Sequence, residues 1–172
     1  ADPEVADAMI AAIRAAQKEM DSVGGIIECR VDGVPVGLGE PVFDKLDATI
    51  AHAVLSIGGI KGIEFGAGFA AADLRGSQNN DPITPEGFVS NNAGGILGGI
   101  STGEPILFRA AMKPTSSIAK EQHTINEAGE AVTISVHGRH DPCLVPRAVP
   151  VVEAMTALAL ADALLQNRCA RL

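Results

Sequence analysis

The chain has 172 residues, which is enough for one domain whose core needs no disulfide or metal for stability. Apolar residues make up 47% of it but aromatic residues only 3%, so we expect a core of aliphatic side chains. The formal net charge of −8 argues against nucleic acid as a general partner, because phosphate backbones are bound through basic surfaces. The three cysteines form no C-x-x-C pair, which argues against a disulfide framework and predicts reduced thiols in a cytoplasmic setting.

The first third of the chain predicts a helix, a strand and a second helix. Apolar residues recur at helical spacing over residues 3–21, and Asp2 precedes them as a candidate N-cap. The run IIECRV (26–31) alternates in polarity, as a strand with one apolar face does. A second helix is expected over residues 46–57, capped by Asp44. Because the chain opens on a helix cap without an initiator Met, we expect a fragment or a trimmed product.

The rest of the chain predicts mainly strands before a final helix. Strands are expected at IKGIEF (60–65), GGILGGIST (94–102), PILFRAAM (105–112) and AVTISVH (131–137), the second pairing with the third through a turn at residues 102–104. Residues 75–95 are polar and are expected to form a long functional loop. The last helix is expected to begin at Pro146 or Pro150 and to end at Arg168, and because polar side chains interrupt its apolar run we expect a buried helix rather than a membrane span. This order favours an α+β layered fold with an antiparallel sheet.

Two short segments could bind an anion. Residues 113–117 (KPTSS) place a cation, three hydroxyls and several backbone N–H groups in one bend after a strand. A plain polar turn is an equally common reason for such a segment. Arg139 and Asp141 stand at a strand end before Pro142, where side chains leave a sheet and approach ligands. Alternatively Asp141 pairs with Arg139 or caps the turn, so the residues alone predict only a phosphorylated small ligand.

Five segments of the chain, in order, are similar to characteristic segments of the chorismate synthase family. They extend over residues 22–165 and read GLGEPVFDKLDATIAHAVLSI, RGSQNND, NNAGGILGGISTGEPI, KPTSSI and GRHDPC followed by VPRAVPVVEAM. The resemblance implies a layered β-α-β sandwich with two pseudo-symmetric halves. Residues 1–172 would be the C-terminal half of such a domain, without the N-terminal half.

The resemblance also implies an enzymatic activity, which the residues alone do not predict. Members of the family convert 5-enolpyruvylshikimate 3-phosphate to chorismate by anti-1,4 elimination of phosphate, in the shikimate pathway of aromatic amino acid biosynthesis. The reaction needs reduced FMN although it involves no net redox change, and some members reduce their own flavin with NADPH. The family enzymes are typically cytoplasmic homotetramers.

The resemblance also implies which residues of this chain form the site, and most of them lie in its second half. The resemblance implies an FMN-binding loop at Lys113, Pro114, Thr115, Ser116 and Ser117, a backbone contact to flavin at Gly98, and further flavin contacts at Gly58 and Gly59, where the family usually has Asn or Gln followed by Ala. Arg139 is implied beside flavin and substrate, and Asp141 as the group that helps to move a proton from the flavin. An Asp141 carboxylate poised against Arg139 would remain ionised.

The resemblance implies that the catalytic histidines and most substrate-binding arginines are on the N-terminal half. We therefore expect that this chain alone has no synthase activity. The alternative is a non-catalytic phosphate-binding, FMN-binding or oligomerisation module that retains the scaffold. No metal is expected, since the prolines near His137, His140 and Cys143 prevent a helix that would place them on one face.

Overall fold

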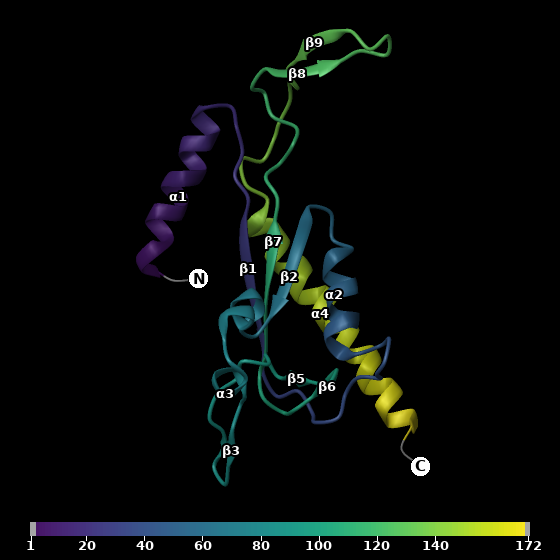
Figure 1. Cartoon of the computed structure of the whole chain (residues 1–172). Coiled ribbons are helices and arrows are strands. Elements are labelled where there is room, and N and C mark those ends of the chain that lie inside the picture. The colour runs from purple at the N-terminus through teal and green to yellow at the C-terminus, as the bar shows by residue number, and fades with distance from the viewer. Residues whose placement is uncertain (1–2, 171–172) are drawn as a thin grey trace.

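The computed structural model describes residues 3–170. Its helices are α1 (Pro3–Lys18), α2 (Leu46–Leu55), α3 (Gly76–Asn79) and α4 (Val145–Ala170), with one 3-10 helix, η1 (Gly68–Asp73). The strands are β1 (Gly25–Val31), β2 (Ile60–Phe65), β3 (Ile83–Thr84), β4 (Gly87–Phe88), β5 (Ile96–Leu97), β6 (Ile100–Ser101), β7 (Ile106–Met112), β8 (Gln122–Ile125) and β9 (Ala131–Ile134). Figure 1 shows α2 and α4 beside a central sheet, with the β8–β9 hairpin standing off its upper end and α3 and β3 at its lower end.

The central sheet has three antiparallel strands in the order β1-β7-β2. Strand β7 alternates strictly, so that its buried residues all point to the helical face: Ile106, Phe108, Ala110 and Met112 are at most 5% exposed. The ring of Phe108 lies 5.5 Å from that of Phe65 on the neighbouring strand. The predicted α+β fold with an antiparallel sheet is confirmed.

Helices α2 and α4 form the layer that covers this face. Leu46, Ile50 and Val54 repeat at helical spacing along α2 and are fully buried. Asp44 is not the cap of this helix, contrary to the prediction from the sequence. The N-cap position is Lys45, which makes no side-chain cap, because Asp44 lies one residue earlier and its backbone pairs with that of Glu40, with N···O distances of 2.8 and 3.1 Å.

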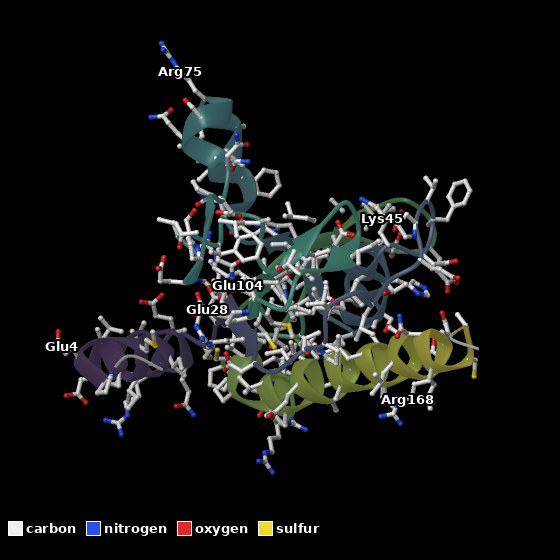
Figure 2. The ribbon with its side chains drawn as sticks, turned by 90° about the horizontal axis from the view of Figure 1, so that it is seen from below. Glu4, Glu28, Lys45, Arg75, Glu104 and Arg168 are labelled. Carbon is white, nitrogen blue, oxygen red and sulfur yellow. The ribbon has the colours of Figure 1, made fainter. Side chains whose placement is uncertain are left out.

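Helix α4 is buried along one face only. Ala148, Val152 and Thr156 are buried, and the Thr156 hydroxyl donates to Val152 O at 2.7 Å. By length and composition α4 could also cross a membrane, a weak criterion that core helices meet as well, and only 17% of its most apolar window is buried. The expectation of a buried helix therefore holds for the inner face, while the outer face carries the exposed apolar side chains of Val151, Leu158 and Leu165, which lie close together at helical spacing. Figure 2 shows Arg168 on this outer side.

The predicted pairing of residues 94–102 with residues 105–112 is wrong. Strands β5 and β6 instead form a hairpin with each other, and β7 pairs with β1 and β2. The physical reason is the turn, because Gly98 and Gly99 have φ values of 59° and 87°. Two consecutive residues with positive φ close a tight two-residue hairpin, which satisfies β5 locally and leaves both edges of β7 to other strands.

The remaining helices and strands differ from those predicted from the sequence mainly in the residues at which they end. Helix α1 ends at Lys18 rather than near residue 21, and the Asp2 cap lies outside the described residues. The strand expected over residues 131–137 ends at Ile134. The polar segment 75–95 contains the short elements α3, β3 and β4, and Figure 2 shows Arg75 projecting far from the body of the molecule.

Candidate functional site

The loop Lys113–Ser117 begins where β7 leaves the sheet, and three other segments hold it. The backbone N–H of Lys113 donates to Gly59 O at 2.9 Å, which fixes the start of the loop beside β2. The Ser22 hydroxyl donates to Thr115 O at 2.6 Å. The Thr115 hydroxyl in turn donates to Asp141 O at 3.0 Å, across 26 residues of sequence. The structure therefore brings together Gly59, the KPTSS loop and the main chain of Asp141.

The loop presents its polar groups outward. Lys113 Nζ lies 3.4 Å from both Ser116 Oγ and Pro114 O, so the ammonium group stays close to the bend. Ser116 is exposed and Ser117 is partly buried. An ammonium group with neighbouring hydroxyls on an exposed bend suits a phosphate, whose oxygens accept such bonds.

Asp141 has a different partner from the one expected. Its Oδ2 accepts a hydrogen bond from Nη1 of Arg147, in the first turn of α4, and no described residue donates to Oδ1. Arg139 is exposed, and its guanidinium takes part in none of the ion pairs or hydrogen bonds found among residues 3–170. The expected pairing of Asp141 with Arg139 is wrong because the turn at residues 141–144 directs the Asp141 carboxylate toward the helix.

A small pocket of about 160 Å³ lies next to Asp141. It is lined by Gln17, Met20, Asp21, Ile118, Ala119, Gly138, His140, Asp141 and Pro142. Asp21 on its wall is bonded to Lys120 at 3.0 Å, and this hydrogen bond lowers the pKa of the Asp21 carboxyl. Within residues 3–170, no group of three His, Cys, Asp or Glu side chains is arranged to hold a metal ion.

The three glycines implied as flavin contacts fall into two places. Gly59 has a φ of 95°, and a Cβ there would lie 2.6 Å from Met112 Sδ, so the backbone passes very close to β7. Gly58 is exposed, and nothing lies within 4 Å of a Cβ built on it, so a longer side chain would find room there. Gly98 lies in the turn of the β5–β6 hairpin, which Figure 1 shows beside the end of the sheet opposite the β8–β9 hairpin. The structure does not bring Gly98 to the loop, and its flavin contact stays a prediction.

Sequence reasoning missed Arg147 and Ser22. Pro146 at the start of α4 is typical of the first helical position and could have placed Arg147 in the first turn. Nothing in the sequence indicates that Ser22 contacts Thr115, because the two residues are 93 positions apart.

The sheet with one helical face and an anion-binding loop at its end defines an α+β protein with a candidate phosphate site. Residues 1–165 match the family model described as chorismate synthase, and the chain belongs to this family. It is 56% identical over 167 residues to the chorismate synthase of Nitratidesulfovibrio vulgaris (strain DP4), covering 97% of this chain and 47% of that protein. It is 58% identical over 175 residues to that of Chloroflexus aurantiacus (strain ATCC 29366 / DSM 635 / J-10-fl), covering 99% and 48%.

A solved structure titled "Crystal Structure of Chorismate Synthase" is similar in fold, with a TM-score of 0.76 and 37% identity. The match covers 96% of this chain and 44% of that one. The chain thus spans about half the length of the curated relatives that it matches. The predicted resemblance is confirmed, whereas the assignment to the C-terminal half stays a prediction.

Proposed function

We propose that this chain supplies the flavin-binding side of a chorismate synthase active site. The enzyme would be a carbon–oxygen lyase that converts 5-enolpyruvylshikimate 3-phosphate to chorismate by anti-1,4 elimination of phosphate. The observation that carries the proposal is the junction of the KPTSS loop, Gly59 and Asp141, within a chain that matches the family over residues 1–165. Together these segments form a polar site at one end of the sheet.

The residues at this junction fit FMN. Lys113 would balance the charge of the FMN phosphate, while Ser116 and Ser117 donate hydrogen bonds to its oxygens. Reduced FMN, if bound here, would supply electron density as the substrate's phosphate leaves and would accept the hydrogen removed from the ring. Arg139, without an acidic partner among the described residues, is free to bind an anionic group of cofactor or substrate. Asp141 Oδ1, to which no described group donates, would accept a proton.

We further propose that this chain alone does not complete the reaction. Elimination needs an acid for the leaving phosphate, and the histidines here are poorly placed for it. His52 and His123 are exposed on α2 and β8, and His137 bonds Ser135. His140 lines the pocket beside Asp141, but its Nε2 is engaged at 3.1 Å from Val136 O. The acid and most substrate-binding arginines would come from the part of the relatives that this chain does not span. The complete enzyme would be a cytoplasmic homotetramer. In some members of the family NADPH would reduce the flavin.

Titration of the chain with FMN tests the site itself. We expect saturable quenching of flavin fluorescence, and Lys113→Ala should raise the Kd about tenfold because one charge-assisted bond to phosphate is lost. Arg168→Ala is the control, since Arg168 is an exposed cation in the last turn of α4, at the end of that helix away from the loop. Equal FMN affinity in the wild type and Lys113→Ala would contradict the proposed site.

The alternative is a packing or oligomerisation module that only retains the scaffold. The exposed apolar residues on the outer face of α4 are the observation that favours it. Size analysis of the chain in solution separates the two, because a stable monomer that binds FMN would count against a purely structural role.

A further inference from the structure

We propose that Arg147 is a positioning residue, which orients the Asp141 carboxylate for its part in the reaction. This inference rests on the proposed function, because it assigns a task to the partner of a residue in that site. Arg147 itself faces solvent for most of its surface and does not belong to the KPTSS loop.

The backbone around Asp141 is fixed from two sides, but its side chain is held from only one. The Thr115 hydroxyl donates to Asp141 O at 3.0 Å, and Val23 N donates to Pro142 O at 2.8 Å. These bonds set the position of the Asp141 main chain and leave the χ rotations of its side chain free. Among residues 3–170, only Arg147 bonds the carboxylate, so it alone selects the direction in which Oδ1 points.

The backbone of Arg147 is held in a fixed position by the first turn of α4. Its backbone N–H donates to Leu144 O at 3.0 Å, in the first turn of α4. The neighbouring Ala148 is 6% exposed and Val152 is 1% exposed, so this turn is anchored in the core. The N-terminal end of a helix also attracts a carboxylate, and this adds to the pull of the guanidinium on Asp141.

The exposure of the pair argues against a role in stability. The Arg147 side chain is 74% exposed and that of Asp141 28% exposed, so water screens much of their attraction. Exposed ion pairs of this kind contribute little to folding. The main consequence of the pair is therefore geometric, and a loss of Arg147 should affect the reaction rather than the fold.

Two arginines near Asp141 would then have separate tasks. Arg139 has no partner among the described residues and is free for an anionic ligand, whereas Arg147 is already engaged. Lys120, whose neighbour Ala119 lines the pocket beside Asp141, is bonded to Asp21 at 3.0 Å. Removal of Arg139 should weaken ligand binding, while removal of Arg147 should slow turnover.

The test uses a polypeptide that joins this chain to the part of the relatives which it does not span, assayed with the phosphorylated substrate and reduced FMN under anaerobic conditions. We expect Arg147→Met to lower kcat about tenfold to a hundredfold, because small displacements of a reacting group have effects of this size. KM, the Kd for FMN and the melting temperature should stay near the wild-type values. Arg147→Lys should recover part of kcat, since it restores the charge without the planar fork.

Three comparisons make the result decisive. Arg168→Met, an exposed arginine on the same helix, should behave as the wild type. In an Asp141→Asn background, Arg147→Met should have no further effect, because the group that it positions is already lost. Unchanged kcat in Arg147→Met, or an additive loss in the double variant, would overturn the inference. If the wild type has no activity, or if Asp141→Asn is fully active, the proposed function fails and the inference fails with it.

Discussion

Asp81 is the single residue that most directly organises the polar segment between β2 and β5. Its Oδ1 accepts bonds from Ser90 Oγ at 2.6 Å and Asn92 N at 2.7 Å, and its Oδ2 accepts one from Ala93 N at 2.9 Å. Burial raises the pKa of the Asp81 carboxyl, but the bonds from Ser90 Oγ, Ala93 N and Asn92 N outweigh it, so the pKa is lowered. The carboxylate thus closes the base of the segment that contains α3, β3 and β4.

We therefore expect Asp81→Asn to destabilise the chain by about 1–3 kcal/mol, because at least one bonded N–H or O–H group loses its acceptor. The folded pKa lies below the ordinary value of 3.8, so this stabilisation is fully present above about pH 4 and is lost as the pH falls through the folded pKa. Urea unfolding at pH 7 and at pH 3 measures both effects. The difference between wild type and Asp81→Asn should shrink at pH 3. Asp73→Asn, at an exposed aspartate, is the control.

The sequence predicts which side chains of a strand or helix are buried wherever the alternation of polar and apolar residues alone determines it. The alternation at Ile27, Cys29 and Val31 correctly predicts the inward face of β1, and the spacing of Leu46, Ile50 and Val54 predicts that of α2. The partner of Asp141 could not be predicted, because Arg139 and Arg147 are both close in sequence. Only the direction of the turn before α4 decides between them.

Helix α4 has two faces that should respond differently to the same substitution. Val152 is 1% exposed and packs in the core, whereas its neighbour Val151 is 43% exposed on the outer face. Val152→Ala should cost about 2 kcal/mol of unfolding free energy, for two buried methyl groups lost, and Val151→Ala should cost less than about 0.5 kcal/mol. Chemical denaturation of both variants measures this, and equal effects would contradict the packing of α4 described here.

The β8–β9 hairpin should be dispensable for the rest of the fold. Its two strands pair with each other, the residues of both strands are largely exposed, and a lone hairpin adds little stability to a domain. Replacement of residues 122–134 by Gly-Gly should leave the melting temperature within about 2 °C of the wild type. Calorimetry measures this, and loss of cooperative unfolding would show that the hairpin supports the sheet.

At the level of whole elements, the sequence predicts which segments are strands but not which strands pair. The run PILFRAAM alternates clearly, yet period-two polarity is the same whether its neighbour is the preceding hairpin or β1 and β2. The pairing depends on the turn at Gly98 and Gly99, whose positive φ values close β5 onto β6. Turn geometry, rather than hydrophobic pattern, decided the topology.

At the scale of the whole molecule, the chain spans about half the length of its relatives, and we propose that it contains one side of their active site. The KPTSS loop, Gly59 and Asp141 meet at one end of the sheet, and His140, which lines the pocket beside Asp141, has its Nε2 engaged at 3.1 Å from Val136 O. The outer face of α4 also exposes apolar side chains, as expected of a surface that packs on further protein. Family membership was recognisable from the order of the motifs, whereas the division of the site between this chain and the rest of the relatives stays a prediction.

The most direct test of the account is formation of chorismate from 5-enolpyruvylshikimate 3-phosphate with reduced FMN under anaerobic conditions. It compares this chain alone, the joined polypeptide, and the joined polypeptide with Lys113→Ala. We predict no turnover by the chain alone, turnover by the joined polypeptide, and a loss of about tenfold or more in kcat/KM at limiting FMN for Lys113→Ala. Turnover by the chain alone would contradict the account. So would an inactive joined polypeptide, or one whose kcat/KM is unchanged by Lys113→Ala.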